Sequence, residues 1–106
     1  MKPPDLPRVA AQICRKYHVQ TLDLFGSRAT GVSRDESDFD FCVAFDELSP
    51  AEYARCFFGV LHELEDVLGR PVDLVTWRSI RKTGLRAAIQ QHGVRIYERE
   101  YAGMPE

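Results

Sequence analysis

Two aspartates with one residue between them, Asp38 and Asp40, are the side chains in this 106-residue sequence best suited to chemistry. Alternate residues of a β-strand point to the same side, so both carboxylates would share one face of a strand, about 7 Å apart. Carboxylate oxygens are the ligands that Mg2+ prefers, and a pair of them can hold the ion between protein and phosphate oxygens. The spacing therefore indicates a metal-assisted reaction of a phosphate compound.

A second short motif, Gly26-Ser27, stands shortly before this pair. It follows the apolar residues Leu24 and Phe25, which predicts that a strand ends at Gly26 and that a short helix begins after it. The first turn of a helix presents free backbone N–H groups and a positive end, and the Ser27 hydroxyl adds a further donor. Such a turn binds phosphate, so the two motifs supply the two halves of a nucleotide site.

Two further acids lie in apolar runs that predict strands. Asp73 stands between Val72 and Leu74, where a charged residue needs a partner or solvent. Its carboxylate either faces solvent near the start of the strand or joins Asp38 and Asp40 at a metal, and the local sequence leaves both alternatives open. Asp23 is expected to be a solvated or hydrogen-bonded strand residue and not a ligand.

The elements that must position these residues follow from hydrophobic periodicity, with a helical period of 3.6 and a strand period of 2. The pattern predicts helices over 6–17, 50–68 and 78–92, a helical turn over 27–31, strands over 19–25, 37–45, 70–77 and 94–97, and a frayed tail over 98–106. We therefore expect one α/β (α+β) domain over 1–106, with helices packed on a small mixed sheet of about four strands.

The strand over 37–45 shows the clearest alternation in the sequence. Large apolar residues take one side, namely Phe39, Phe41, Val43 and Phe45, and the other side carries Asp38, Asp40, Cys42 and Ala44. A slip of one residue would turn both aspartates into the core. The pattern that builds the core therefore also aims the two carboxylates to the opposite face.

The helix over 50–68 begins with a capping box, Ser49-Pro50-Ala51-Glu52. It carries a main apolar stripe and a second one beside it. The main stripe is Ala54, Phe57, Phe58, Leu61, Leu64 and Leu68, and the second is Tyr53, Cys56, Val60 and Val67. Two stripes indicate either a wide buried face or a face that partly meets a partner protein.

A basic stripe stands on the expected helix over 78–92. Its members are Arg78, Arg81, Lys82 and Arg86. Such a stripe is typical of a solvated helix face, but one placed just after an acid-bearing strand could also meet triphosphate, pyrophosphate or a partner bound to nucleic acid.

Composition narrows the class of protein. The chain has 14 basic and 16 acidic residues and a net charge of −2, which gives no support for nonspecific binding to nucleic acid. It has no apolar run of the length of a signal peptide or a membrane span, so we expect a soluble, cytoplasmic protein. The three cysteines, Cys14, Cys42 and Cys56, are widely spaced at apolar positions, which predicts buried free thiols.

The order G-S-x-A-x-G, a short loop, S-D-x-D-x-x-V and then an acid in an apolar strand about thirty residues later resembles the DNA polymerase β-type nucleotidyltransferase superfamily. The size and element order more closely resemble the minimal nucleotidyltransferases that are paired with HEPN-domain toxins. The residues that carry the resemblance are Gly26, Ser27, Ala29, Gly31, Ser37, Asp38, Asp40, Val43 and Asp73.

The resemblance implies a polymerase β-like nucleotidyltransferase fold and a role for each motif residue. Asp38 and Asp40 would bind two Mg2+ ions, and Asp73 would complete the second metal site and could accept the proton of the attacking hydroxyl. Gly26, Ser27 and Ser37 would bind the nucleotide, with ATP as the substrate. The catalytic residues would then be the same three aspartates that hold the metal.

The resemblance also implies a reaction and a partner. AMP would pass from ATP to a hydroxyl, with tyrosine the expected acceptor, on a cognate HEPN toxin, so that the chain acts as an antitoxin in a hetero-oligomer. Direct contact with nucleic acid or a membrane is not expected. Two alternatives remain, namely an antitoxin that neutralises its toxin by binding alone, through the apolar helix around Phe57, and a nucleotidyltransferase for small molecules that works as a self-dimer.

Overall fold

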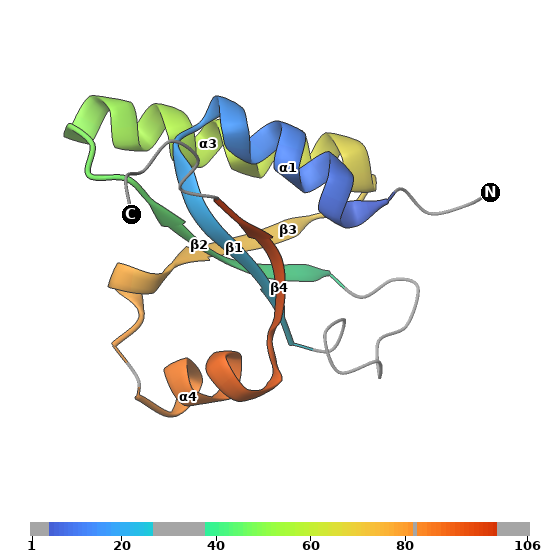
Figure 1. Cartoon of the computed structure of the whole chain (residues 1–106), viewed down its shortest axis with the longest axis vertical. Coiled ribbons are helices and arrows are strands. Elements are labelled where there is room, and N and C mark those ends of the chain that lie inside the picture. Colours follow the sequence, from blue (N-terminus) through green and yellow to red (C-terminus); the bar gives the residue numbers. More distant parts are fainter. Residues whose placement is uncertain (1–4, 27–37, 82, 100–106) are drawn as a thin grey trace, which may run out of the picture.

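A computed structural model describes residues 5–26, 38–81 and 83–99 of the chain as a four-stranded sheet with helices on both sides (Figure 1). The elements are α1 (Leu6–Lys16), β1 (Val19–Phe25), β2 (Phe39–Phe45), α3 (Pro50–Leu68), β3 (Val72–Thr76), the 3-10 helix η1 (Trp77–Ser79), α4 (Thr83–His92) and β4 (Val94–Glu98). The predicted α+β class and mixed sheet are confirmed.

The strand order of the sheet is β3-β2-β1-β4. β1 runs antiparallel to β2 and to β4, whereas β2 and β3 are parallel and are joined through α3, the kind of crossover that parallel strands need. This topology places the start of β2 beside the start of β3, and the end of β1 beside the start of β2. Phe25 pairs with Asp40, and Asp40 pairs with Asp73.

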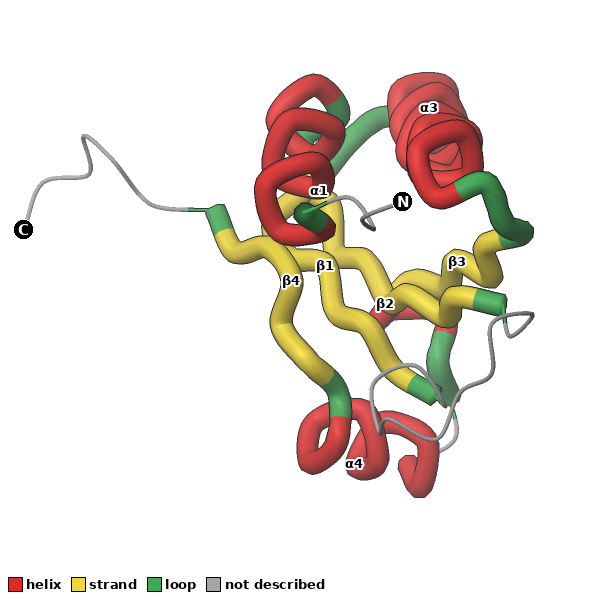
Figure 2. The backbone as a smooth tube through the Cα atoms, turned by 90° about the vertical axis from the view of Figure 1, so that its right-hand side faces the viewer, coloured by secondary structure: helices red, strands yellow, loops and turns green. Residues whose placement is uncertain are grey.

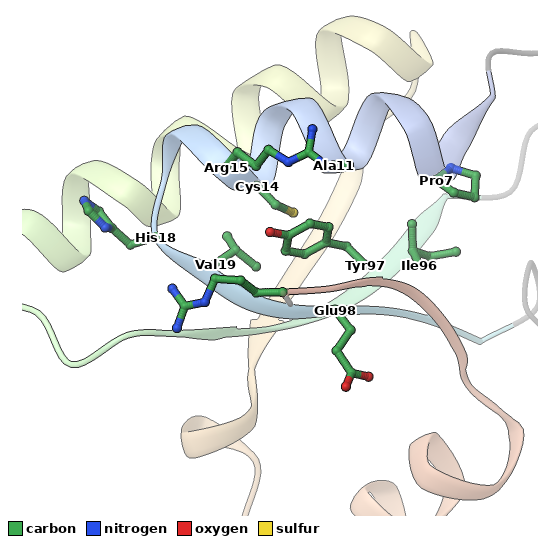
Figure 3. A pocket seen from close by; sticks show the side chains of 10 residues that line it. Pro7, Ala11, Cys14, Arg15, His18, Val19, Ile96, Tyr97 and Glu98 are labelled. Atoms are coloured by element: carbon green, nitrogen blue, oxygen red, sulfur yellow. The ribbon is translucent and has the colours of Figure 1, made fainter. Parts of the chain in front are cut away.

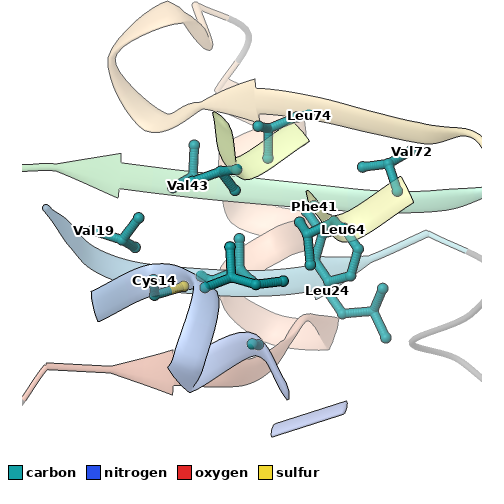
Figure 4. Close-up of a cluster of buried hydrophobic side chains, with 12 residues drawn as sticks. Cys14, Val19, Leu24, Phe41, Val43, Leu64, Val72 and Leu74 are labelled. Atoms are coloured by element: carbon teal, nitrogen blue, oxygen red, sulfur yellow. The ribbon is translucent and has the colours of Figure 1, made fainter. Parts of the chain in front are cut away.

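The main core lies between the sheet and the helix pair α1 and α3, as Figures 2 and 4 show. Phe41 and Val43 are fully buried there, and Phe39 and Phe45 pack against the same cluster. The alternation predicted for β2 is therefore confirmed.

The opposite face of the sheet is covered by α4 (Figure 2). Cys42, Ile80 and Ile89 form a small second core there, with Phe25, Val75 and Trp77 at its border. All three cysteines are free and buried, as predicted, and burial raises the pKa of Cys14 and of Cys42 to about 12. These thiols are inert core residues at neutral pH.

Helix α3 begins as predicted, because the Ser49 hydroxyl accepts a hydrogen bond from the Glu52 backbone N–H at 3.3 Å. Its buried side draws on both predicted stripes, since Leu64 belongs to the main stripe and Cys56 and Val60 belong to the second. Cys56, Val60 and Leu64 are buried, whereas Phe58 is 53% exposed. Ala54, Phe58 and Val67 are exposed, so a wide buried face is wrong for these three positions, and a partner contact there stays a prediction.

The C-terminal third differs most from the sequence prediction. The strand ends at Thr76, residues Trp77–Ser79 form η1, and α4 begins only at Thr83, so the predicted helix over 78–92 is too long. Of its apolar residues, Ile89 is buried and Leu85 is 38% exposed. One helix face therefore cannot carry all the residues of the basic stripe.

The chain end is ordered further than predicted. β4 continues to Glu98, and the Arg99 backbone N–H donates to the Gln20 carbonyl at 2.9 Å. The Arg99 guanidinium also pairs with Asp46. The prediction of a frayed tail is thus wrong for Glu98 and Arg99, and 100–106 lie outside the described residues. Among the described helices, none has the length and hydropathy to cross a membrane.

Candidate active site

The three acids that the sequence singled out lie at one end of the sheet. Asp40 and Asp73 are each the second residue of their strand and are register partners on the parallel pair β2 and β3. Neighbouring strands lie about 4.8 Å apart, and partners in register point to the same face. Asp38 directly precedes β2. The structure therefore brings Asp73 beside the Asp38 and Asp40 pair while leaving it exposed near the start of its strand, so its part at a metal stays a prediction.

The electrostatics of Asp40 reflect this arrangement. Burial raises the pKa of the Asp40 carboxyl above its usual value, and the negative charges of Asp73 and Asp38 raise it further. Three carboxylates on one face repel one another, so a bound cation is favoured there. Asp73 on β3 and Asp38 just before β2 are therefore both close enough to Asp40 for their charges to act on it.

The donor set fits a hard cation such as Mg2+, because it consists of carboxylate oxygens only. Within the described residues, however, no three His, Cys, Asp or Glu side chains stand close enough to hold a metal ion together. The structure shows the acids as neighbours on one face and not as a formed metal site. Their role as metal ligands stays a prediction.

Gly26 directly follows β1 and has a backbone φ of +76°. A Cβ atom at this position would lie 2.5 Å from Oδ2 of Asp40. Glycine is therefore required both by the left-handed backbone and by the close approach of the Asp40 carboxylate. The predicted role of Gly26 in nucleotide binding stays a prediction, and Ser27, Ser37 and the helical turn over 27–31 lie outside the described residues.

Asp23 shares this face of the sheet but has another partner. Its carboxylate Oδ1 accepts a hydrogen bond from Nε of Arg95 on β4 at 2.6 Å, and the residue is only 5% exposed. Arg95 also donates to Glu98 at 2.7 Å. The prediction of a hydrogen-bonded Asp23 is confirmed. Its partner Arg95 stands 72 residues away, and no sequence pattern pointed to it.

The basic stripe is not one helix face, because Arg78 lies in η1, Arg81 follows η1 and only Arg86 lies in α4. Arg86 donates to the Trp77 carbonyl at 2.7 Å and to the Ile80 carbonyl at 3.2 Å, and its guanidinium lies 5.6 Å from the centre of the Trp77 ring. It thereby ties α4 to η1. Arg78 instead lies over the Tyr53 ring, and Lys82 is outside the described residues. The prediction of a single stripe is wrong.

Two hollows lie away from the acids. A cavity of about 530 Å3 lies between α1 and β4, with Tyr97, Cys14 and Arg15 among its lining residues (Figure 3). A more open groove of about 540 Å3 lies between α3 and β3, with Phe57 and Phe58 on its helix side. None of the three site aspartates lines either hollow, so neither is the predicted nucleotide site.

Comparisons with known proteins agree with the architecture. Residues 10–102 match a family model described as polymerase beta, nucleotidyltransferase. A candidate protein adenylyltransferase of Methanocaldococcus jannaschii is 37% identical over 76 residues, which are 72% of this chain and 75% of the relative.

Solved structures give the same picture. The crystal structure of a toxin-antitoxin with AMP-PNP superposes with a TM-score of 0.67 at 25% identity, over 91% of this chain and 76% of that chain. A structure named as a candidate minimal nucleotidyltransferase has a TM-score of 0.63 at 28% identity, over 83% of this chain and 86% of that chain.

Proposed function

Because the chain belongs to the polymerase β nucleotidyltransferase family, we propose that it transfers AMP from ATP to a hydroxyl group of a partner protein. One observation carries this proposal: Asp40 and Asp73 are in register on parallel strands, and the charge of Asp38 also acts on Asp40. That arrangement gives one face of the sheet three acids beside Gly26. It suits a reaction in which several phosphate oxygens must be held and a proton must be removed.

In this proposal each residue has a defined part. Asp38 and Asp40 would hold Mg2+, which supplies charge neutralisation at the phosphates. Asp73 accepts the proton of the acceptor hydroxyl. The acceptor oxygen forms a bond to the α-phosphorus while the bond from that phosphorus to the bridging oxygen breaks and pyrophosphate leaves. Gly26 leaves room for the Asp40 carboxylate, and Ser27 and Ser37 would bind the phosphates.

The acceptor class rests on the relatives. The Methanocaldococcus jannaschii relative carries the name of a protein adenylyltransferase, and the neighbour with AMP-PNP is a toxin-antitoxin. We therefore take the acceptor to be a toxin partner of this chain. A HEPN-domain toxin, modified on a tyrosine, is the partner that the motif resemblance implies.

The test is direct. The purified chain is incubated with Mg-ATP and the product of the neighbouring gene, and mass spectrometry is used to look for added AMP on that protein. Asp38→Ala combined with Asp40→Ala should abolish the adduct. Asp66→Ala is the matched control, because Asp66 is an exposed acid of α3 away from the site, and it should leave the adduct unchanged. Adduct formation by the double variant would refute the assignment of these acids.

A second candidate function has its own observation. Phe58 is 53% exposed at the rim of the apolar groove between α3 and β3, so this surface could bind the toxin without any transfer. Under that alternative, Phe58→Ser would abolish neutralisation of the toxin, and the double aspartate variant would still neutralise it without an adduct. Loss of neutralisation in the double aspartate variant, with binding retained, would favour the enzyme.

A further inference from the structure

The edge strand β3 has a neighbouring strand on one side only in the part of the chain that the structure describes. On that side the Pro71 carbonyl accepts a hydrogen bond from the Phe39 backbone N–H at 3.4 Å. Because the C=O and N–H of one trans peptide point in opposite directions, the N–H of Val72 points away from β2. The start of β3 therefore carries a backbone donor that the sheet does not satisfy.

Glu65 satisfies this donor. Its carboxylate Oε2 accepts the Val72 N–H at 3.1 Å, seven residues away along the chain. The backbone carbonyl of the same residue accepts the Gly69 N–H at 2.8 Å and so ends α3. One residue thus fixes both ends of the short connection from α3 to β3.

The position of this bond matters because Asp73 is the next residue after Val72. Asp73 is exposed, and its negative charge acts on Asp40 across the parallel pair. Repulsion between these carboxylates pushes an edge strand outward, where no further strand holds it. The bond from Glu65 restrains the backbone from the outer side, directly beside the residue that is repelled.

We propose that Glu65 is a positioning residue that holds the start of β3 so that Asp73 stays in register with Asp40. The proposal rests on the proposed function, because it takes these two aspartates as the groups that hold metal and nucleotide. Glu65 acts through the Val72 backbone and touches neither nucleotide nor acceptor. In this role, what matters is that a side-chain oxygen of Glu65 accepts the hydrogen bond, and the negative charge of Glu65 does not matter.

Two variants of Glu65 separate the effect of its hydrogen-bond-accepting oxygen from the effect of its negative charge. Glu65→Gln keeps an oxygen acceptor at the same reach and removes the charge, whereas Glu65→Asp keeps the charge and shortens the reach by one methylene group. Asp66→Ala is the matched control, because Asp66 is the adjacent acid of α3 and its side chain is exposed. Asp73→Asn serves as the reference for loss of the site.

The experiment measures Mn2+ binding by electron paramagnetic resonance in the presence of α,β-methylene-ATP, without any acceptor protein. We expect Glu65→Asp to weaken Mn2+ binding about 10-fold to 100-fold, the usual effect of removing an outer support of a metal ligand. Glu65→Gln should stay within about threefold of the unaltered chain, and Asp66→Ala should match it. In the same samples, hydrogen exchange of the Val72 amide should be faster in Glu65→Asp alone.

Two results would overturn the proposal. The first is Mn2+ binding by Glu65→Asp at the unaltered affinity although the Val72 amide exchanges faster. The second is an equal loss in Glu65→Gln and Glu65→Asp, which would mean that the charge matters. The unaltered chain could bind Mn2+ while Asp73→Asn does not, and yet modify no partner protein. In that case the proposed acceptor protein is wrong, and the positioning role of Glu65 is unaffected.

Discussion

The two faces of the sheet differ in how completely they are covered. On the face of α1 and α3, Phe41 and Val43 of β2 are fully buried in a core that extends across the sheet. On the other face, the shorter α4 covers Cys42, while Asp40 is only partly buried and Asp73 is exposed. The face under α1 and α3 thus supplies the stability that offsets the repulsion between the like charges on the other face. The alternation of a single strand creates the division.

The largest expected effect on stability concerns the face of the sheet that α1 and α3 cover. Phe41→Ala removes a fully buried ring and should lower the free energy of unfolding by about 3–5 kcal/mol. Chemical denaturation measures this change. The matched control is Phe58→Ala, because the 53% exposed ring of Phe58 should contribute less than about 1 kcal/mol. Equal losses in the two variants would mean that the main core is not where the structure places it.

A smaller loss of stability is expected when the pair of Asp23 and Arg95, on the opposite face of the sheet, is broken. Arg95→Ala leaves the Asp23 carboxylate, whose side chain is 8% exposed, without its partner. We expect a loss of about 2 kcal/mol in the free energy of unfolding, since Arg95 itself is 45% exposed and solvent screens part of the interaction. In Asp23→Asn with Arg95→Ala, much of this loss should be recovered. No recovery would show that Arg95 acts through other contacts.

Two glycines allow strain and site geometry to be separated. Gly26 and Gly69 both have positive φ, at +76° and +66°, but a Cβ at Gly69 meets nothing within 4 Å. Each change to alanine should cost about 1 kcal/mol of stability. Only Gly26→Ala displaces the Asp40 carboxylate, so AMP transfer should fall at least about tenfold in that variant alone. A comparable fall in Gly69→Ala would contradict the assignment.

The smallest effect concerns pH. Because burial and the charges of Asp73 and Asp38 raise the pKa of Asp40 above 3.8, the folded state binds this proton more tightly than the unfolded state. Stability from this group therefore falls as pH rises from 3.8 through the raised pKa. Without metal, Asp40→Asn should be more stable at pH 7 by about 0.5 kcal/mol, and the gain should shrink toward pH 4.

Addition of Mg-ATP should reverse that order. The melting temperature of the unaltered chain should rise, because a ligand that binds only the folded state stabilises it, and that of Asp40→Asn should not. Thermal unfolding with and without Mg-ATP, and after chelation of the metal, measures the difference. An unchanged melting temperature of the unaltered chain at saturating Mg-ATP would contradict an intact site.

The sequence predicted what depends on period and local chemistry. The alternation of β2, the capped start of α3 at Ser49 and the apolar positions of the cysteines are short-range features, and the structure confirms them. The placement of Asp73 beside Asp40 needed the parallel pairing of two strands, which the resemblance supplied and local sequence did not.

What the sequence missed depends on contacts between distant residues. The pairing of Asp23 with Arg95 joins β1 and β4, and no periodicity encodes it. The break between η1 and α4 is stabilised by Arg86 reaching back to two carbonyls, so a residue that looked like part of a basic stripe is a structural tie. For α3, the sequence offered a main and a second apolar stripe, and which of their residues are buried depends on how the helix packs against the sheet and α1.

Nucleotidyl transfer at the face of the sheet that carries Asp40 and Asp73 is tested most directly by the position of a radioactive label in ATP. The chain is incubated with its partner protein, Mg2+ and ATP labelled at either the α-phosphate or the γ-phosphate. We predict that only the α-label becomes covalently attached, that pyrophosphate is released, and that Asp73→Asn abolishes both. Attachment of the γ-label, or attachment of the α-label that persists in Asp73→Asn, would contradict the account.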